Sequence, residues 1–254
     1  MIEESIHWQL PVPTPYAMSL LVWVIIAIMS IRAAKKISFL PDPMQGFFEV
    51  VIETVTEIAD TSIGKDAPKY YPLFIGIFIY VLFANLLGLI PGMMSPTASL
   101  NTTIALALIV FIYYNFQGIK TNGLSYLKHF LGPITKWYAF PLMILFIFIE
   151  TIGQLARPVS LSIRLFGNIF AKEILLGILA ILCLVFANPQ SIFLMPAPLL
   201  LRPLIVVLGV LVSLIQAGVF TILSIIYVAG AVAHHDEGHG EHGEHAEQQP
   251  QAHT

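Results

Sequence analysis

The sequence predicts an all-α, polytopic membrane protein, and three observations support this fold class. Hydrophobic residues make up 57% of the chain and charged residues only 11%, whereas about one quarter of an average soluble domain is charged. Three apolar segments have the length of an ordinary membrane span, which needs about 20 residues. Two further apolar segments are much longer. We therefore expect three ordinary spanning helices, one interfacial amphipathic helix and a hairpin of two long, tilted or horizontal helices.

The three ordinary spans are predicted over residues 16–36, 71–90 and 101–118. The stretch ahead of the first span carries Glu3 and Glu4 and no basic region, which is untypical of a cleaved signal peptide. The first span is therefore expected to stay in place as an anchor. Together with the long helices, these spans form a single membrane domain over residues 1–233.

Residues 43–65 are too polar to insert but have helical periodicity. Acidic residues recur there on one side, and apolar residues fill much of the remaining surface, as in an amphipathic helix that lies along the cytoplasmic interface. A docking helix for a partner is the functional alternative. The acidic residues are Glu49, Glu53, Glu57 and Asp60, and the apolar ones are Phe47, Phe48, Val51, Ile52, Val55 and Ile58.

The two long helices are predicted over residues 138–187 and 199–233. At 1.5 Å per residue the first would extend roughly 75 Å, far more than the bilayer thickness. It must therefore be steeply tilted or kinked. Pro158 removes one backbone donor and is the expected position of a bend.

Basic residues concentrate in alternate connections and so orient the chain. Residues 1–15, 91–100 and 188–198 contain no Lys or Arg, and by the positive-inside rule they face outward. Five segments with the N-terminus outside and the C-terminus in the cytoplasm satisfy every connection. The residues that mark the cytoplasmic side are Arg32, Lys35 and Lys36 after the first span, and Lys120, Lys128 and Lys136 after the third.

Several kinds of site are not expected. The net charge of −3 and the scattered basic residues argue against nucleic-acid binding, and no Gly-rich phosphate loop of Walker type is present. Six of the eight histidines lie in residues 234–254. Clustered imidazoles can bind transition metals, but this tract lacks cysteine and the spacing of a zinc site, and its glycines favour a disordered cytoplasmic tail. No cofactor or metal site is therefore predicted.

A polar stripe runs along each long helix. At about 100° per residue, the polar residues of the first helix fall within a sector of roughly 120° and those of the last helix within about 80°. In an antiparallel hairpin Arg164 and Gln216 come to similar depth. The first stripe comprises Glu150, Gln154, Arg157, Ser160, Arg164, Asn168 and Lys172, and the second comprises Arg202, Gly209, Ser213, Gln216, Ser224 and Tyr227.

Arg164 is the central candidate for function. A charge at mid-membrane costs at least about 2.5–3.5 kcal/mol, and arginine does not lose its proton. A structural ion pair with Glu150 or Glu173, or snorkelling to the interface, is the plain alternative. Glu150 lies nearly four turns away and Glu173 points about 140° from Arg164. We therefore favour a functional arginine that faces a carboxylate on another chain.

The segment SLSIRLFGNIFAKE at 160–173 resembles the signature of subunit a of F-type ATP synthases. In that family an S-L-x-x-R-L-F-G-N segment carries an essential arginine, here Arg164. The resemblance continues in NLLGLIPG at 85–92, in the turn at 96–103, and at Pro158 and Gln216. It covers residues 41–233 in order and spacing.

The resemblance implies a stator subunit of a proton-transporting two-sector ATP synthase in the bacterial inner membrane. The chain would not bind nucleotide itself and so would not be an enzyme alone. Its partners would be a ring of c subunits, the peripheral-stalk b subunits, the rest of the ATP synthase complex and membrane lipid. Two offset half-channels would pass protons to and from the ring carboxylates, with Arg164 between them. The residues expected to face the ring are Leu161, Arg164, Asn168 and Gln216.

The predicted orientation assigns the other polar residues to the two half-channels. Glu173, Asn168 and Gln216 suit the outer one, and Glu150 and Gln154 suit the inner one, with Ser160 on the same stripe. Lys172 departs from the family pattern, in which a small residue is common. Gly209 leaves room for it, and its charge is expected to tune the outer channel, although pairing with Glu173 or snorkelling is the plain alternative.

Two readings from other classes remain open. A self-contained secondary transporter or channel would need its own carboxylate, for which Glu150 and Glu173 are candidates, and usually broken helices near the midplane. A scaffold that only assembles other subunits would leave the costly intramembrane polar stripe unexplained.

Overall fold

The computed structural model describes residues 14–35, 43–90, 93–123, 140–186 and 192–232. All regular secondary structure in these ranges is helical, which confirms the predicted all-α class. Four of the described helices are long and apolar enough to cross a membrane, or up to five if a bent pair counts as one span. The His-rich tail, Lys36 and the connection with Lys128 and Lys136 lie outside the described residues.

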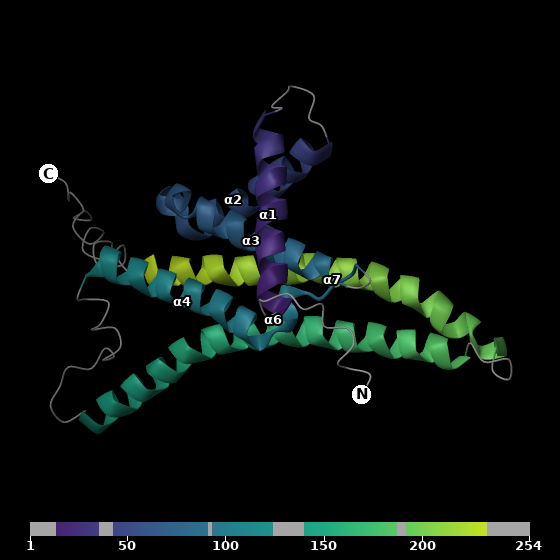
Figure 1. Cartoon of the computed structure of the whole chain (residues 1–254). Helices are drawn as coiled ribbons and strands as arrows, with labels where there is room; N and C mark the ends of the chain where they lie inside the picture. The colour runs from purple at the N-terminus through teal and green to yellow at the C-terminus, as the bar shows by residue number, and fades with distance from the viewer. Residues whose placement is uncertain (1–13, 36–42, 91–92, 124–139, 187–191, 233–254) are drawn as a thin grey trace, which may run out of the picture.

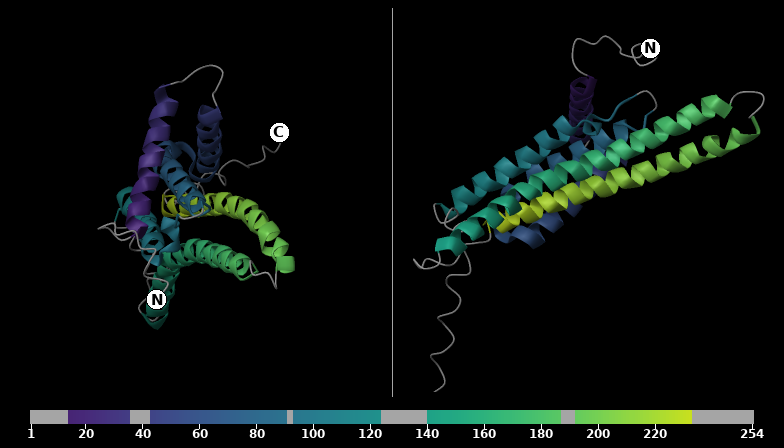
Figure 2. Two further views of the ribbon diagram at one scale, coloured as in Figure 1. Left: turned by 45° about the vertical axis from the view of Figure 1, so that its right-hand side comes forward. Right: turned by 90° about the horizontal axis from the view of Figure 1, so that it is seen from below.

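Helix α1 (Thr14–Lys35) carries its basic residues only at its C-terminal end, Arg32 and Lys35. It stands crosswise to the two long helices, as Figures 1 and 2 show from different sides. Its contacts are with α2, α3 and the short turn before α4. Most of its apolar surface is exposed, as expected for a helix surrounded by lipid.

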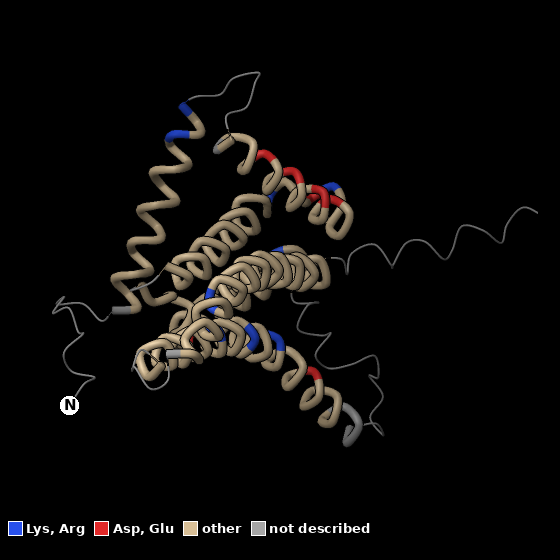
Figure 3. Tube along the Cα trace, turned by 90° about the vertical axis from the view of Figure 1, so that its right-hand side faces the viewer, with Lys and Arg blue, Asp and Glu red and all other residues tan. Residues whose placement is uncertain are grey.

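Helix α2 (Pro43–Ile63) is amphipathic. Phe48, Val51, Val55 and Ala59 are buried in the core, while the acidic residues, whose positions are red along α2 in Figure 3, are exposed. The 3-10 helix η1 (Gly64–Lys69) follows, beginning at Gly64 with a φ of +77° that suits glycine. The chain then turns by 117° into α3 (Tyr71–Leu87).

Polar contacts fix this turn. The Tyr71 hydroxyl donates a hydrogen bond to the Asp60 carboxylate. Lys69 Nζ donates to Asp66 Oδ1 at 2.6 Å, and this hydrogen bond raises the pKa of Lys69 above its ordinary value. Lys69 therefore keeps its positive charge at the end of α2 and η1, at the start of a strongly apolar helix.

Helix α3 ends at Leu87, three residues before the end predicted from the sequence, because the chain turns at Gly88, Leu89 and Ile90. A second short 3-10 helix, η2 (Pro96–Ala98), leads into α4 (Leu100–Asn122). Helix α4 ends at Asn122 and is followed by Gly123, whose φ of +57° favours glycine. It packs against both long helices.

The long hairpin consists of α6 (Phe140–Phe186) and α7 (Pro196–Val232), joined through the 3-10 helix η4 (Ile192–Leu194). The two helices run side by side, and α6 changes direction part-way along (Figures 1 and 2). Pro158 lies inside α6 and is buried. The hairpin of two long apolar helices predicted from the sequence is therefore confirmed.

The core lies where α2, α3, α4, α6 and α7 meet. Phe74, Val81, Val110, Leu165 and Phe220 are among its fully buried side chains. Small and hydroxyl-bearing residues of α7 let the helices approach closely, as is typical of helix packing in membranes. Beyond this junction, both long helices expose large apolar side chains that suit lipid or a partner surface.

Candidate ion-translocation site

Arg164 lies on an exposed flank of α6. The helix buries Leu161 and Leu165 in the core on one side, which leaves the guanidinium on the adjoining side. Within the part of the chain that the structure describes, Arg164 makes no hydrogen bond or ion pair. In particular, it is not paired with Glu150 or Glu173, the alternative that the sequence had left open.

One helical turn further on, α6 contacts α7 through an amide pair. Asn168 Nδ2 donates a hydrogen bond to Gln216 Oε1 at 2.8 Å. Gln216 is only 3% exposed, and its Nε2 has no partner among the described residues. The structure thus brings Gln216 to the part of α6 that carries Arg164, and it leaves one buried amide donor available.

Toward the N-terminal end of α6, polar side chains form what we call the Gln154 cluster: Tyr114, Glu150, Gln154, Arg157 and Tyr227. The Tyr114 hydroxyl donates to Gln154 Oε1 at 2.8 Å, and Gln154 Nε2 donates to Glu150 Oε1 at 3.0 Å. Arg157 Nη1 donates to Gln154 Oε1 at 3.3 Å and its guanidinium lies 5.4 Å from the Tyr227 ring centre. Helices α4, α6 and α7 all contribute to this cluster.

Toward the C-terminal end of α6 lies what we call the Glu173 cluster: Asn85, Ser95, Thr97, Lys172 and Glu173. Glu173 Oε1 accepts a hydrogen bond of 2.9 Å from the Ser95 backbone N–H. The Ser95 and Thr97 hydroxyls are 2.6 Å apart, and Thr97 Oγ1 donates to Asn85 Oδ1 at 2.7 Å. This cluster ties α6 to α3 and to the turn before α4.

Lys172 points into the protein. Its Nζ donates to the Asn85 backbone oxygen at 3.1 Å, and the side chain is buried. No ion pair between Lys172 and Glu173 is present in the described ranges, and the buried side chain does not snorkel. Neither plain alternative for Lys172 therefore matches the structure. The Asn85 amide Nδ2 beside it is buried and without a hydrogen-bond partner in the described part of the chain.

Two glycines make room for this cluster. A Cβ on Gly88 would lie 2.6 Å from Ser95 Cβ, 3.2 Å from the Ser95 backbone nitrogen and 3.3 Å from Glu173 Oε1. A Cβ on Gly209 would lie 2.6 Å from Leu89 Cδ2 and 3.2 Å from Lys172 Cδ. Gly209 therefore does leave space for the Lys172 side chain.

The residues expected to face a partner separate into two pairs. Arg164 and Asn168 are exposed. Leu161 is 1% exposed and Gln216 is 3% exposed, so the chain's own helices cover them, and contact of these two residues with a ring stays a prediction. Helical periodicity predicted which residues lie on one side of each long helix. It could not show that neighbouring helices of the same chain bury some of them. Ser160 is exposed on the same side as Arg164.

Several polar residues of the site were not predicted from the sequence. Ser95 and Asn85 contact Glu173 and Lys172 of α6 across 78 and 87 residues, and Thr97 is hydrogen-bonded to Asn85. Tyr114 reaches Gln154 across 40 residues. The usable signal was Asn85, a polar residue inside the very apolar helix α3. Its partners depend on tertiary packing, which no local pattern reveals.

Comparison with known proteins supplies the family. The sequence model of the family described as ATP synthase A chain matches residues 16–229. The chain belongs to this family. Two relatives with the name ATP synthase subunit a are those of Sulfurihydrogenibium sp. (strain YO3AOP1), 42% identical over 85% of this chain and 96% of its own length, and of Geobacter sulfurreducens, 44% identical over 83% and 85%. A third, from Desulfotalea psychrophila, is 46% identical over 78% and 75%.

As an ATP synthase A chain, this multi-pass membrane protein is a component of a larger complex. A surface that is exposed in the single chain is therefore open to another subunit as well as to lipid. This distinction matters most for the flank of α6 that carries Ser160, Arg164 and Asn168.

Proposed function

We propose that the chain is the stator subunit that passes protons to and from a ring of c subunits through two offset half-channels, with Arg164 separating them. The observation that carries this proposal is that Arg164 is exposed, has no acidic partner among the described residues, and lies between two polar clusters that are each anchored inside the chain.

The spacing along α6 supports two separate paths. Gln154 precedes Arg164 by ten residues and Glu173 follows it by nine, which corresponds to about 15 Å and about 14 Å at 1.5 Å per residue. The described hydrogen bonds of the Gln154 cluster and those of the Glu173 cluster share no residue. A proton that enters at one cluster thus has no hydrogen-bonded route past Arg164 to the other within the described contacts.

The electrostatics of the bilayer supply the mechanism. An ionised carboxylate is costly in lipid and a neutral one much less so. A ring carboxylate that reaches Arg164 is favoured in its ionised form, so it releases its proton to one half-channel, and it takes up a proton from the other before returning to lipid. Each unit charge that crosses 100 mV supplies about 2.3 kcal/mol to the rotation.

The proposed orientation assigns the clusters to the two sides. With the N-terminus outside and the C-terminus in the cytoplasm, the Glu173 cluster serves the outer half-channel and the Gln154 cluster the inner one. Ser160 and Asn168 flank Arg164 on the exposed side of α6 and would contact the ring. Peripheral-stalk b subunits would hold the chain in place in the bacterial inner membrane.

The test is ATP-driven proton pumping in inverted membrane vesicles that contain the complex with Arg164→Ala or Arg164→Lys. We expect both variants to assemble and to lose coupled pumping. The lysine variant should fail because lysine is a hydrated point charge without the planar guanidinium. Arg202→Ala is the matched control, since Arg202 lies on the other long helix, α7, and belongs to neither polar cluster. The complex with this variant is expected to keep pumping. Near-normal pumping by Arg164→Ala in an assembled complex would contradict the proposal.

A further inference from the structure

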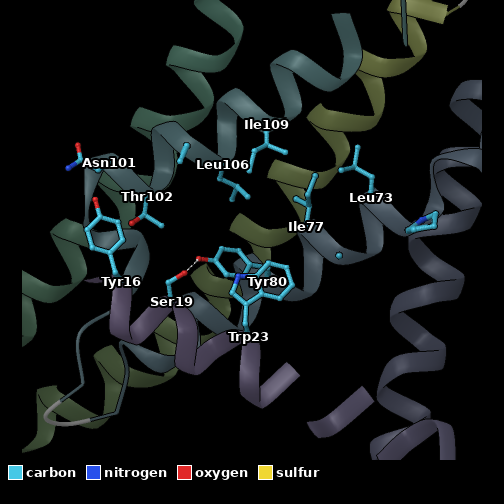
Figure 4. Close-up of a pocket in the computed structure, with 13 residues that line it drawn as sticks. Tyr16, Ser19, Trp23, Leu73, Ile77, Tyr80, Asn101, Thr102, Leu106 and Ile109 are labelled. Carbon is cyan, nitrogen blue, oxygen red and sulfur yellow. Dashed lines mark hydrogen bonds between the residues drawn. The ribbon is translucent and has the colours of Figure 1, made fainter. Parts of the chain in front are cut away.

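A pocket of about 510 Å³ lies between α1, α3 and α4, and its lining shares no residue with either polar cluster. Figure 4 shows its lining. Its volume is in the range typical of small-molecule sites. Side chains from all three helices form its walls, among them Ser19, Trp23, Ile77, Tyr80, Leu106 and Ile109.

The pocket is polar at one end only. Tyr16, Asn101 and Thr102 lie together there, while Leu73 and Ile77 line the region away from them (Figure 4). In the middle, the hydroxyls of Ser19 and Tyr80 are hydrogen-bonded to each other at 2.7 Å. This arrangement suits an amphiphile with a long apolar part.

The polar end coincides with the start of α4. The N-cap residue Ser99 makes no side-chain capping hydrogen bond. The Asn101 and Thr102 side chains have no hydrogen-bond partner among the described residues. The first turn of a helix carries partial positive charge and unpaired N–H groups, which favour an anion. A phosphate group therefore fits this end of the pocket.

The surroundings of the pocket are those of a lipid-facing surface. Leu20 and Val24 on α1, and Ile104 and Leu108 on α4, are exposed apolar side chains near the pocket walls. If α1 spans the bilayer, Tyr16 lies near the helix start, at the level where tyrosines are enriched, and Trp23 lies about 10 Å deeper. The polar end then faces the headgroups and the apolar part faces the hydrocarbon.

We propose that this pocket holds one acyl chain of a membrane glycerophospholipid, whose phosphate lies beside Tyr16, Asn101 and Thr102 at the start of α4. A phospholipid matches both the apolar length of the pocket and its anion-favouring end. The residues that line this site take no part in the two polar clusters of the proposed proton path.

The test uses the assembled complex in membranes that contain phosphatidylglycerol with a photoreactive diazirine on its acyl chain. Crosslinked peptides are mapped by mass spectrometry. We expect preferred crosslinks to the pocket walls around Ile77 and Leu106. Gly76→Phe on α3 and Ala105→Phe on α4 each add a bulky side chain to the pocket lining, and a Cβ on Gly76 meets nothing within 4 Å.

Both filling variants are expected to lower these crosslinks by about tenfold, which corresponds to displacing only about two buried methylene groups. Gly230→Phe, on α7 where a Cβ likewise meets nothing within 4 Å, is expected to leave them unchanged. Diazirine-labelled diacylglycerol, which lacks the phosphate, is expected to crosslink more weakly. The proposal is overturned if the filling variants do not reduce the crosslinks, if crosslinks are spread evenly over all lipid-facing helices, if another subunit occupies the pocket, or if diacylglycerol crosslinks equally well.

Discussion

At the scale of single residues, the Glu173 cluster depends on two very close approaches. At Gly88 the neighbours are the Ser95 Cβ and backbone nitrogen, which belong to a packed turn. At Gly209 the nearest neighbour is a methyl at the end of the Leu89 side chain, and Lys172 Cδ, partway along its side chain, comes next. The end of a side chain such as Leu89 can rotate away from a new methyl group, whereas the backbone of Ser95 cannot move without shifting the whole turn. Equal contact distances should therefore have unequal consequences.

We expect Gly88→Ala to destabilise the protein by about 1–3 kcal/mol, the usual cost of overpacking, and to weaken the Ser95–Glu173 hydrogen bond. Gly209→Ala, with the same nearest distance of 2.6 Å, is the matched control and is expected to cost clearly less. The measurement is the thermal stability of the solubilised complex, followed by loss of this subunit. An equal or larger loss for Gly209→Ala would show that the turn at Ser95 is not rigid.

At the scale of helices, the contact between Asn168 and Gln216 fixes how α6 and α7 lie against each other. Asn168→Leu would leave both ends of the buried Gln216 amide without a partner, which costs about 1–3 kcal/mol. Gln216→Leu removes that amide and leaves Asn168 on the exposed side. We therefore expect Asn168→Leu to be the more damaging single change.

The double variant Asn168→Leu/Gln216→Leu should be about as stable as Gln216→Leu alone, because no orphaned amide remains. A double-mutant cycle on the stability of the solubilised complex measures this coupling. Additive effects of the two substitutions would mean that the hydrogen bond is not formed in the assembled protein.

The direction of α6 also belongs to this scale. Pro158 lacks the N–H that would bond to the Gln154 carbonyl, so the helix bends instead of running straight. Pro158→Ala is expected to straighten α6 and to lengthen the distance between spin labels placed at Phe148 and Ile178, both exposed. Pulsed electron resonance on the solubilised complex measures that distance. If the distribution of distances between the labels is the same with and without Pro158, tertiary packing and not the proline causes the bend.

At the scale of the whole molecule, sequence reasoning succeeded where one helix determines the outcome. Length and hydropathy predicted the long helices, and periodicity predicted the amphipathic character of α2 and the polar residues of α6. It did not reveal that Ser95 holds Glu173 or that Lys172 reaches Asn85, since both contacts join distant segments. Nor did it show that other helices of the chain bury Gln216. Periodicity tells on which side of its helix a residue lies, but not which segment packs against that side.

Orientation in the membrane is a property of the whole chain and rests on its charges. Lys65 and Lys69 lie at the turn between α2 and α3, and Arg32 and Lys35 end α1, whereas residues 91–100 contain no basic residue. Basic connections stay in the cytoplasm, so Lys65 should be inside and Met93 outside. Both side chains are exposed in the structure.

These positions permit a direct test in a Cys183→Ser background, which removes the single native cysteine. With a membrane-impermeant maleimide, we expect Met93→Cys to react in spheroplasts and Lys65→Cys to react only in inverted vesicles. Pumping by each variant confirms that the labelled protein is assembled. The reverse labelling pattern would place the Glu173 cluster, which includes Ser95 just after Met93, on the cytoplasmic side, and the two proposed half-channels would then exchange their roles.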